Sequence, residues 1–233
     1  MNLLPINKII LASFAFALTH WKKIIEISIL PVLVSLPFLL ILPQILELVE
    51  TAFKGGDLAD STLPEGMVIY LLLFLYGYLS LAINMYRLVI LGPQSVSLKT
   101  PIFNFNQIAR FIGLTLIVGL ATTVPVILTG LGFLQLVAYF LIIPITLNFI
   151  NIALQNPSQY KWGLNFISQA NLFLLQVIIP ALIGMITTFL FNAAGLPEFF
   201  EWVVKIVVFY WSLVNLALCY QLIIKSNTLN TSR

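Results

Sequence analysis

Charge is what this sequence of 233 residues has least of. Asp, Glu, Lys and Arg make up 8% of the residues, compared with about 25% in a soluble globular domain, while 61% are hydrophobic and the mean hydropathy is +1.06. A soluble core of this size does not accommodate so many apolar side chains, so the sequence predicts a chain embedded in lipid. The net charge of +3 is not gathered into a basic patch, which argues against a nucleic-acid partner.

Residues that carry chemistry are also scarce. The single cysteine, Cys219, excludes a disulfide framework and any cysteine-based metal cluster. The single histidine, His20, leaves nearly the whole chain without the commonest general base and metal ligand. No acidic residue lies in the middle of an apolar segment, and no metalloprotease, phosphate-loop or Ser–His motif is present. The sequence therefore predicts a protein that is not an enzyme and that has no metal and no cofactor.

Six apolar segments are each long enough to cross a bilayer. Turn signals separate them, the clearest being Gly92-Pro93 and Gly130-Leu131-Gly132. The pattern predicts an all-α membrane protein that forms a single integral membrane domain over residues 1–233. The six transmembrane helices are expected at 24–49, 67–91, 108–129, 133–154, 172–194 and 202–225.

The basic residues predict the orientation of these helices. If the N-terminus is cytoplasmic, two of the 11 Lys and Arg residues, Lys54 and Lys205, fall outside. An excess of Lys and Arg in short cytoplasmic loops is what the positive-inside rule describes. Both termini are therefore expected in the cytoplasm, with these basic residues on that side: Lys8, Lys22, Lys23, Arg87, Lys99, Arg110, Lys161, Lys225 and Arg233.

The first residues, 5–23, read as a helix that lies in the membrane interface. One side of this helix carries the two lysines and small or polar residues, and the opposite side is apolar. The alternative is a fraying extension of the first span. The two sides are Lys8, Ala12, Ala15, Thr19 and Lys22 against Ile10, Phe14, Leu18 and Trp21.

Proline spacing suggests an internal repeat. Pro5, Pro101 and Pro157 open three half-polar stretches, and each is followed at a similar distance by a proline inside an apolar segment: Pro31, Pro125 and Pro180. We expect three parallel repeats of an interfacial helix plus two spans, at about 5–93, 94–156 and 157–233. The alternative is coincidence, because prolines favour helix starts in any case.

Polar residues share faces on the even-numbered spans. Spacings of three and four place them on one side of each helix, and a buried amide in hydrocarbon must find a partner. One hypothesis is a polar pocket open to the cytoplasm, in which Arg87 attracts an anionic headgroup or solute. The other is hydrogen bonding between helices, with Arg87 reaching to the interface. The candidate residues are Ser80, Asn84, Arg87, Asn148, Asn151 and Asn215.

Further residues near the expected membrane boundaries suggest contacts with lipid headgroups: His20, Trp21, Lys22, Lys23, Arg110, Lys161 and Trp162. Tyr86, Trp202 and Tyr220 are also typical of the aromatic belt at a membrane surface. Two stripes of small residues predict close contacts between helices. These stripes are Thr115, Gly119 and Thr122 on the third span, and Ala181, Gly184 and Thr188 on the fifth.

The passage AINMYRLVILG, residues 82–92, resembles a stretch in uncharacterised six-span membrane proteins of proteobacteria. Tyr86, Arg87, Leu91 and Gly92 fit that pattern, and Pro93 stands where those proteins have Glu. The layout of interfacial helices and span pairs is also similar to the YciC-like proteins and to the membrane domain of some glycerophosphodiester phosphodiesterases. The resemblance implies a bacterial inner-membrane protein and supplies no catalytic residues.

Three functions are compatible with these patterns. The first is a non-enzymatic inner-membrane scaffold that binds membrane lipid, or a protein partner in the membrane, through its interfacial helices. The second is a small transporter or channel with a cytoplasm-facing polar pocket. The third is an intramembrane lipid-modifying enzyme, which the scarcity of acid–base residues disfavours. The sequence does not specify an oligomeric state.

Overall fold

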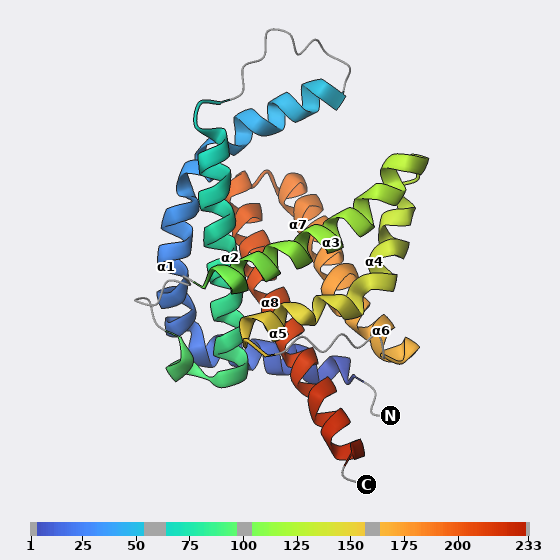
Figure 1. The fold of residues 1–233 in the computed structure, drawn as a ribbon. Coiled ribbons are helices and arrows are strands. Elements are labelled where there is room, and N and C mark those ends of the chain that lie inside the picture. The colour runs from blue at the N-terminus through green and yellow to red at the C-terminus, as the bar shows by residue number, and fades with distance from the viewer. Residues whose placement is uncertain (1–3, 54–63, 97–103, 157–163, 232–233) are drawn as a thin grey trace.

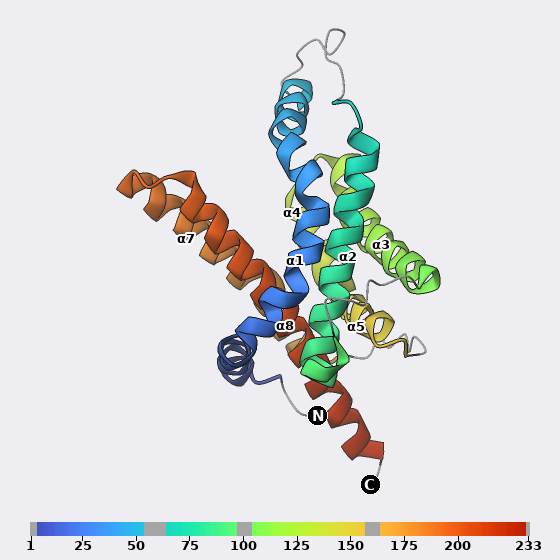
Figure 2. The same cartoon turned by 90° about the vertical axis from the view of Figure 1, so that its left-hand side faces the viewer.

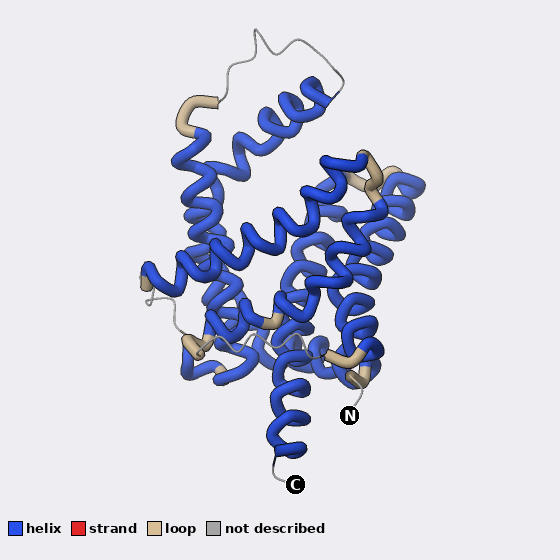
Figure 3. Tube along the Cα trace, turned by 45° about the vertical axis from the view of Figure 1, so that its right-hand side comes forward, coloured by secondary structure: helices blue, strands red, loops and turns tan. Residues whose placement is uncertain are grey.

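The computed structural model describes residues 4–53, 64–96, 104–156 and 164–231, and these form helices joined by short turns, with no strand among them (Figures 1 and 3). Six of these helices or helix combinations are long and apolar enough to cross a membrane. The prediction of an all-α membrane protein with six spans is therefore confirmed. The elements are α1 (Ile6–Phe53), α2 (Met67–Leu91), η1 (Pro93–Ser95), α3 (Phe105–Thr129), α4 (Phe133–Thr146), α5 (Asn148–Ala153), α6 (Phe166–Phe173), η2 (Leu174–Ile178), α7 (Ile179–Ala194) and α8 (Glu198–Thr231).

The first helix is bent at His20. Its backbone angles there, φ −112° and ψ 16°, are not helical, so α1 consists of a short N-terminal part and a long span. Figure 1 shows the N-terminal part of α1 lying across the lower end of the molecule, while the rest of α1 rises away from it. The span contains Pro31, Pro37 and Pro43, each of which removes a backbone donor and favours bending.

The third and fifth spans begin closer to their preceding loops than the sequence suggested. Asn104 caps α3 by accepting a hydrogen bond from the backbone N–H of Gln107, and Asn165 caps α6 in the same way from Ser168. Since each capped helix continues directly into its span, no separate interfacial helix is present between 104 and 129 or between 164 and 194. Residues 97–103 and 157–163 lie outside the described residues. The three-repeat organisation stays a prediction.

The spans pair into three hairpins: α1 with α2, α3 with α4, and α7 with α8. The turn between α3 and α4 depends on Gly130, whose φ of 71° is left-handed and favours a residue without Cβ. The α7–α8 hairpin leans away from α1 and α2 in Figure 2, and the α3–α4 hairpin leans to the right in Figure 1. The hairpins thus diverge at one end of the molecule and converge at the other.

The core lies where the hairpins converge. The buried apolar side chains of α2 run from Leu79 to Val89, and those of α8 run from Trp211 to Tyr220. The short helix α5 packs between α2 and α3 at the same end. By contrast, α7 has no buried residue, so the diverging ends leave their apolar side chains for lipid to cover.

Close packing of α1 against α2 depends on Gly77. A Cβ at this position would come within 2.3 Å of Ser35 Oγ and 2.6 Å of the Pro31 carbonyl oxygen. The two small-residue stripes behave differently, because a Cβ at Gly119 or Gly184 would meet no atom within 4 Å. The predicted close contact is therefore not found at the glycines themselves. Of the other stripe residues, Thr122 is buried and Thr188 donates a hydrogen bond to Glu201 on α8.

Candidate functional site

Arg87 is held at the C-terminal end of α5. Its Nε donates a hydrogen bond of 2.8 Å to the Ala153 carbonyl oxygen, and its Nη2 donates one of 3.3 Å to Gln107 Oε1. The last carbonyls of a helix have no partner within the helix and carry partial negative charge. The guanidinium of Arg87 therefore serves as a cap for α5, supplied from α2.

Gln107 completes this arrangement from α3. Its Nε2 donates to the carbonyl oxygens of Ile152 and Ala153, at 2.8 and 3.1 Å, and its side chain is buried. Gln155 donates a hydrogen bond of 3.3 Å to the same Gln107 oxygen. We call Arg87, Gln107 and Gln155, together with the carbonyls they bind, the Arg87 cluster. It joins three elements that are distant in the sequence, α2, α3 and α5.

Two of the candidate asparagines also have partners. Asn151 Nδ2 donates a hydrogen bond of 3.0 Å to Asn148 Oδ1, and the Tyr220 hydroxyl donates to Asn151 Oδ1. These two hydrogen bonds connect α5 to α8. The structure also corrects the interpretation of Tyr220 and Tyr86 as aromatic-belt anchors, because these side chains are only 5% and 3% exposed. Both tyrosines belong to the core.

The remaining candidates are buried without a hydrogen bond among the described residues. Asn215 on α8 is completely buried, and neither its Nδ2 nor its Oδ1 has a partner. Ser80 and Asn84 on α2 are 5% and 6% exposed. An unpaired buried amide costs about 1–3 kcal/mol, so Asn215 is the most costly polar side chain in this core. The prediction of a polar pocket stays a prediction, carried by these three residues.

Four of the seven candidate headgroup residues, His20, Trp21, Lys22 and Lys23, lie at the bend of α1. The His20 ring stacks on Phe16, with ring centroids 4.4 Å apart, and Lys22 Nζ lies 5.6 Å from the centroid of the Trp21 ring. Lys23 forms an ion pair of 2.9 Å with Glu26. Arg110 is exposed on the first turns of α3. Lys161 and Trp162 lie outside the described residues.

Sequence reasoning did not identify Gln107, a single polar residue near the start of α3, where a polar side chain is ordinary and no spacing relates it to Arg87. Gln155 continues the three- and four-residue spacing of Asn148 and Asn151 on the fourth span, but this spacing does not predict its contact with Gln107. The acidic residue Glu201, which pairs with Lys205 at 2.6 Å near the start of α8, was also missed. No group of three or more His, Cys, Asp or Glu residues in the described part of the chain could hold a metal ion.

Comparison with known proteins gives no relative: no family model matches this chain, and neither does a curated protein or a solved structure.

Proposed function

We propose that this integral membrane protein is a non-enzymatic scaffold of a bacterial inner membrane and that its N-terminal helix binds lipid at the cytoplasmic surface. The observation that carries the proposal is the exposure of large apolar side chains on that helix. Leu11, Phe14, Leu18 and Trp21 are 70%, 53%, 78% and 53% exposed. Such a surface is stable in contact with acyl chains, and it is costly in water.

The other faces of the helix have different surroundings. Ile9 and Ser13 are 1% exposed, and Ser13 Oγ accepts a hydrogen bond of 2.8 Å from Trp211 Nε1 on α8. Lys8, near the start of this helix, and Lys22, just after the bend, are exposed as well. A buried face, an exposed apolar face and exposed lysines together support a helix lying in the plane of the interface.

Lipid contact can be tested by measuring how deep side chains of the N-terminal helix lie in the bilayer. Single cysteines at Leu18, Lys22 and Ile9, in a Cys219→Ala background, would be spin-labelled in the full-length protein in bilayers. We expect the label at position 18 to be accessible to oxygen, the label at 22 to a water-soluble nickel chelate, and the label at the buried position 9 to neither. Equal access of the nickel chelate to positions 18 and 22 would show that the helix projects into water.

Lipid binding itself can be tested with the lysines. We expect Lys8→Gln combined with Lys22→Gln to lower the amount of anionic phospholipid that co-purifies with the protein, because each lysine near an anionic surface contributes about 1 kcal/mol. The matched control replaces both residues by Arg and keeps the charge. If the Gln variant retains as much anionic lipid as the Arg variant, these lysines do not bind headgroups.

The proposed orientation rests on the distribution of Lys and Arg. The beginning of α1 and the end of α8 lie at the same end of the molecule (Figure 1), as an even number of spans requires. Fusion of alkaline phosphatase to the C-terminus is expected to give no activity, and fusion of a fluorescent protein to give signal, because the first is active only outside the cytoplasm. The opposite pair of results would overturn the orientation.

A small transporter or channel is the second candidate, favoured by the unpaired amide of Asn215. A water-filled path would supply the hydrogen bonds that Asn215 lacks in this structure. Cysteines placed at Ser80 and Asn84 would then react with a water-soluble thiol reagent added to inside-out vesicles. If both remain unreactive under conditions that label a cysteine at the exposed Lys22, the pocket hypothesis fails.

A further inference from the structure

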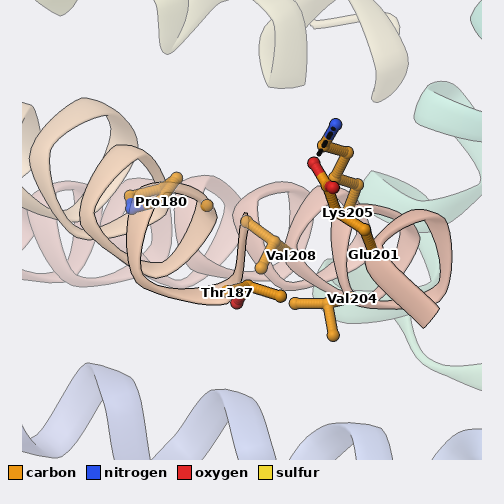
Figure 4. A pocket seen from close by; sticks show the side chains of 7 residues that line it. Pro180, Thr187, Glu201, Val204, Lys205 and Val208 are labelled. Carbon is orange, nitrogen blue, oxygen red and sulfur yellow. Dashed lines mark ion pairs between the residues drawn. The ribbon is translucent and has the colours of Figure 1, made fainter. Parts of the chain in front are cut away.

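A groove of about 110 Å³ lies between α7 and α8, on the part of the hairpin that leans away from the core. Figure 4 shows that the ion pair of Glu201 and Lys205 lies at one end of the groove and Pro180 at the other. The residues that line the groove between these ends have mainly apolar or small side chains. The residues used below are Pro180, Gly184 and Thr187 from α7, and Glu201, Lys205 and Val208 from α8.

The groove exists because α7 presents a small residue where the two helices separate. A Cβ at Gly184 would meet no atom within 4 Å. On the side of α7 that carries Gly184, Ala181 is exposed and Pro180 and Thr187 are partly exposed, so the described chain covers this side only in part. In a protein that crosses the membrane, such a surface faces acyl chains.

The polar end of the groove is well organised. Glu201 Oε1 accepts hydrogen bonds from Thr188 Oγ1 at 2.8 Å and from Lys205 Nζ at 2.6 Å. The Glu201 side chain is 17% exposed, whereas that of Lys205 is 51% exposed and lies 5.2 Å from the centroid of the Trp202 ring. Glu201 thus holds the ammonium group in place, and two of its three N–H donors remain for an acceptor from outside.

The depth of these groups matches a phospholipid. Lys205 is seven residues after Glu198, where α8 begins, which corresponds to roughly 10 Å along the helix. Long lysine side chains near the end of a transmembrane helix extend outward to the headgroup region. The Lys205 end of the groove therefore lies near headgroup depth, and the groove continues past Gly184 to Pro180 and Val208 in the hydrocarbon.

We propose that this groove binds one phospholipid from the leaflet on the side of the α7–α8 turn. Lys205 donates hydrogen bonds to the phosphate, and one acyl chain lies over Gly184 towards Pro180 and Val208. Charge and shape both favour this occupant: an ammonium group with available donors at one end suits a phosphate, and an open apolar groove at the other suits a chain. The site is separate from the N-terminal helix and does not depend on its role.

The experiment uses the full-length protein in nanodiscs that contain a phospholipid with a photoreactive acyl chain. Labelled peptides are identified by mass spectrometry after illumination. We expect labelling to concentrate on α7 and α8 near Gly184. Gly184→Leu fills the groove and is expected to lower this labelling at least about fivefold. Gly119→Leu on α3 adds the same side chain to another open position and is expected to leave the labelling of α7 and α8 unchanged.

The phosphate contact has its own test. Lys205→Gln changes a half-exposed side chain, so the variant is expected to fold, and labelling of α7 and α8 is expected to fall about threefold to fivefold. Diacylglycerol with the same photoreactive chain is expected to label these helices less than the phospholipid, and inorganic phosphate is expected not to compete. Competition by phosphate would assign the site to a free anion and overturn the proposal.

Three other results would also overturn it. Uniform labelling of all six spans that Gly184→Leu does not change would mean that the groove holds only bulk lipid. Equal labelling by diacylglycerol and phospholipid would exclude the phosphate contact. Crosslinks from α7 to a second protein chain, in place of lipid, would identify the groove as a protein interface. If Gly184→Leu fails to fold, the Lys205→Gln and diacylglycerol measurements decide the outcome.

Discussion

The contact between α1 and α2 at Gly77 gives the sharpest prediction about stability. Gly77→Ala places a Cβ 2.3 Å from Ser35 Oγ and 2.6 Å from the Pro31 carbonyl oxygen. The Ser35 hydroxyl can rotate away only by giving up its hydrogen bond of 2.8 Å to the same carbonyl. The carbonyl belongs to the backbone, so α1 must move away from α2 to make room.

The magnitude follows from three contributions. Overpacking of a close contact typically costs about 1–3 kcal/mol. Loss of the Ser35 hydrogen bond costs about 1 kcal/mol, and the better helix propensity of Ala returns about the same amount. We therefore expect Gly77→Ala to lower the free energy of unfolding by about 1–3 kcal/mol. The measurement is unfolding of the purified protein in mixed micelles by increasing SDS, followed by circular dichroism.

Two variants serve as controls for this prediction. Gly119→Ala makes the same substitution in a span, where the new Cβ meets no atom within 4 Å, and is expected to leave stability unchanged or raise it by up to about 1 kcal/mol. Ser35→Ala is expected to relieve part of the cost of Gly77→Ala, because the nearest atom is then absent. If Gly77→Ala is as stable as Gly119→Ala, α1 and α2 do not pack at this distance.

Three further predictions concern the polar core and use the same unfolding measurement. Arg87→Met is expected to cost about 1–3 kcal/mol because it removes the charge-assisted hydrogen bonds to the Ala153 carbonyl and to Gln107. Arg87→Lys is expected not to restore stability, because a single ammonium does not reproduce these two contacts. Full stability of the Lys variant would contradict this geometry. Tyr220→Phe removes one hydrogen bond to Asn151 on α5 and is expected to lower the free energy of unfolding by about 1 kcal/mol. An unchanged midpoint of SDS unfolding would contradict that hydrogen bond. Asn215→Leu is expected to be neutral or stabilising by up to about 3 kcal/mol, since the amide has no partner among the described residues. A large destabilisation would show that Asn215 binds water or a solute, as a transport pathway requires.

The positions of the helix ends were predictable because they depend on local chemistry. Gly92 ends α2 and Gly130 ends α3 with positive φ values of 85° and 71°, at the two turn signals identified in the sequence. The bend near His20 was expected from the change of pattern between the N-terminal stretch and the first span. The beginning of the fifth span was misplaced because Asn165 caps a helix six residues before the apolar run expected to begin it.

The candidate site was predictable only in part. The sequence identified Arg87, Asn148 and Asn151 as polar groups that require partners in an apolar environment. It did not identify Gln107 as a partner of Arg87, since the two belong to different hairpins and no periodicity relates them. Tyr220 was assigned to the membrane surface for the same reason: its place near a span boundary is local information, and its burial against α5 is not.

The sequence by itself determined that this chain crosses the membrane six times, because hydropathy and length act over each segment separately and lipid leaves helices as the available structure. It also determined where α2 and α3 end, because Gly92 and Gly130 act on their neighbouring backbone. Only the tertiary structure decided which faces are covered. Where the hairpins converge, Asn215 is buried and Arg87 forms its hydrogen bonds to α5 and α3. Where they diverge, Gly184 stays open in the groove that Lys205 also lines. Which side chains are buried depends on how whole helices lean against each other, and the sequence does not state this.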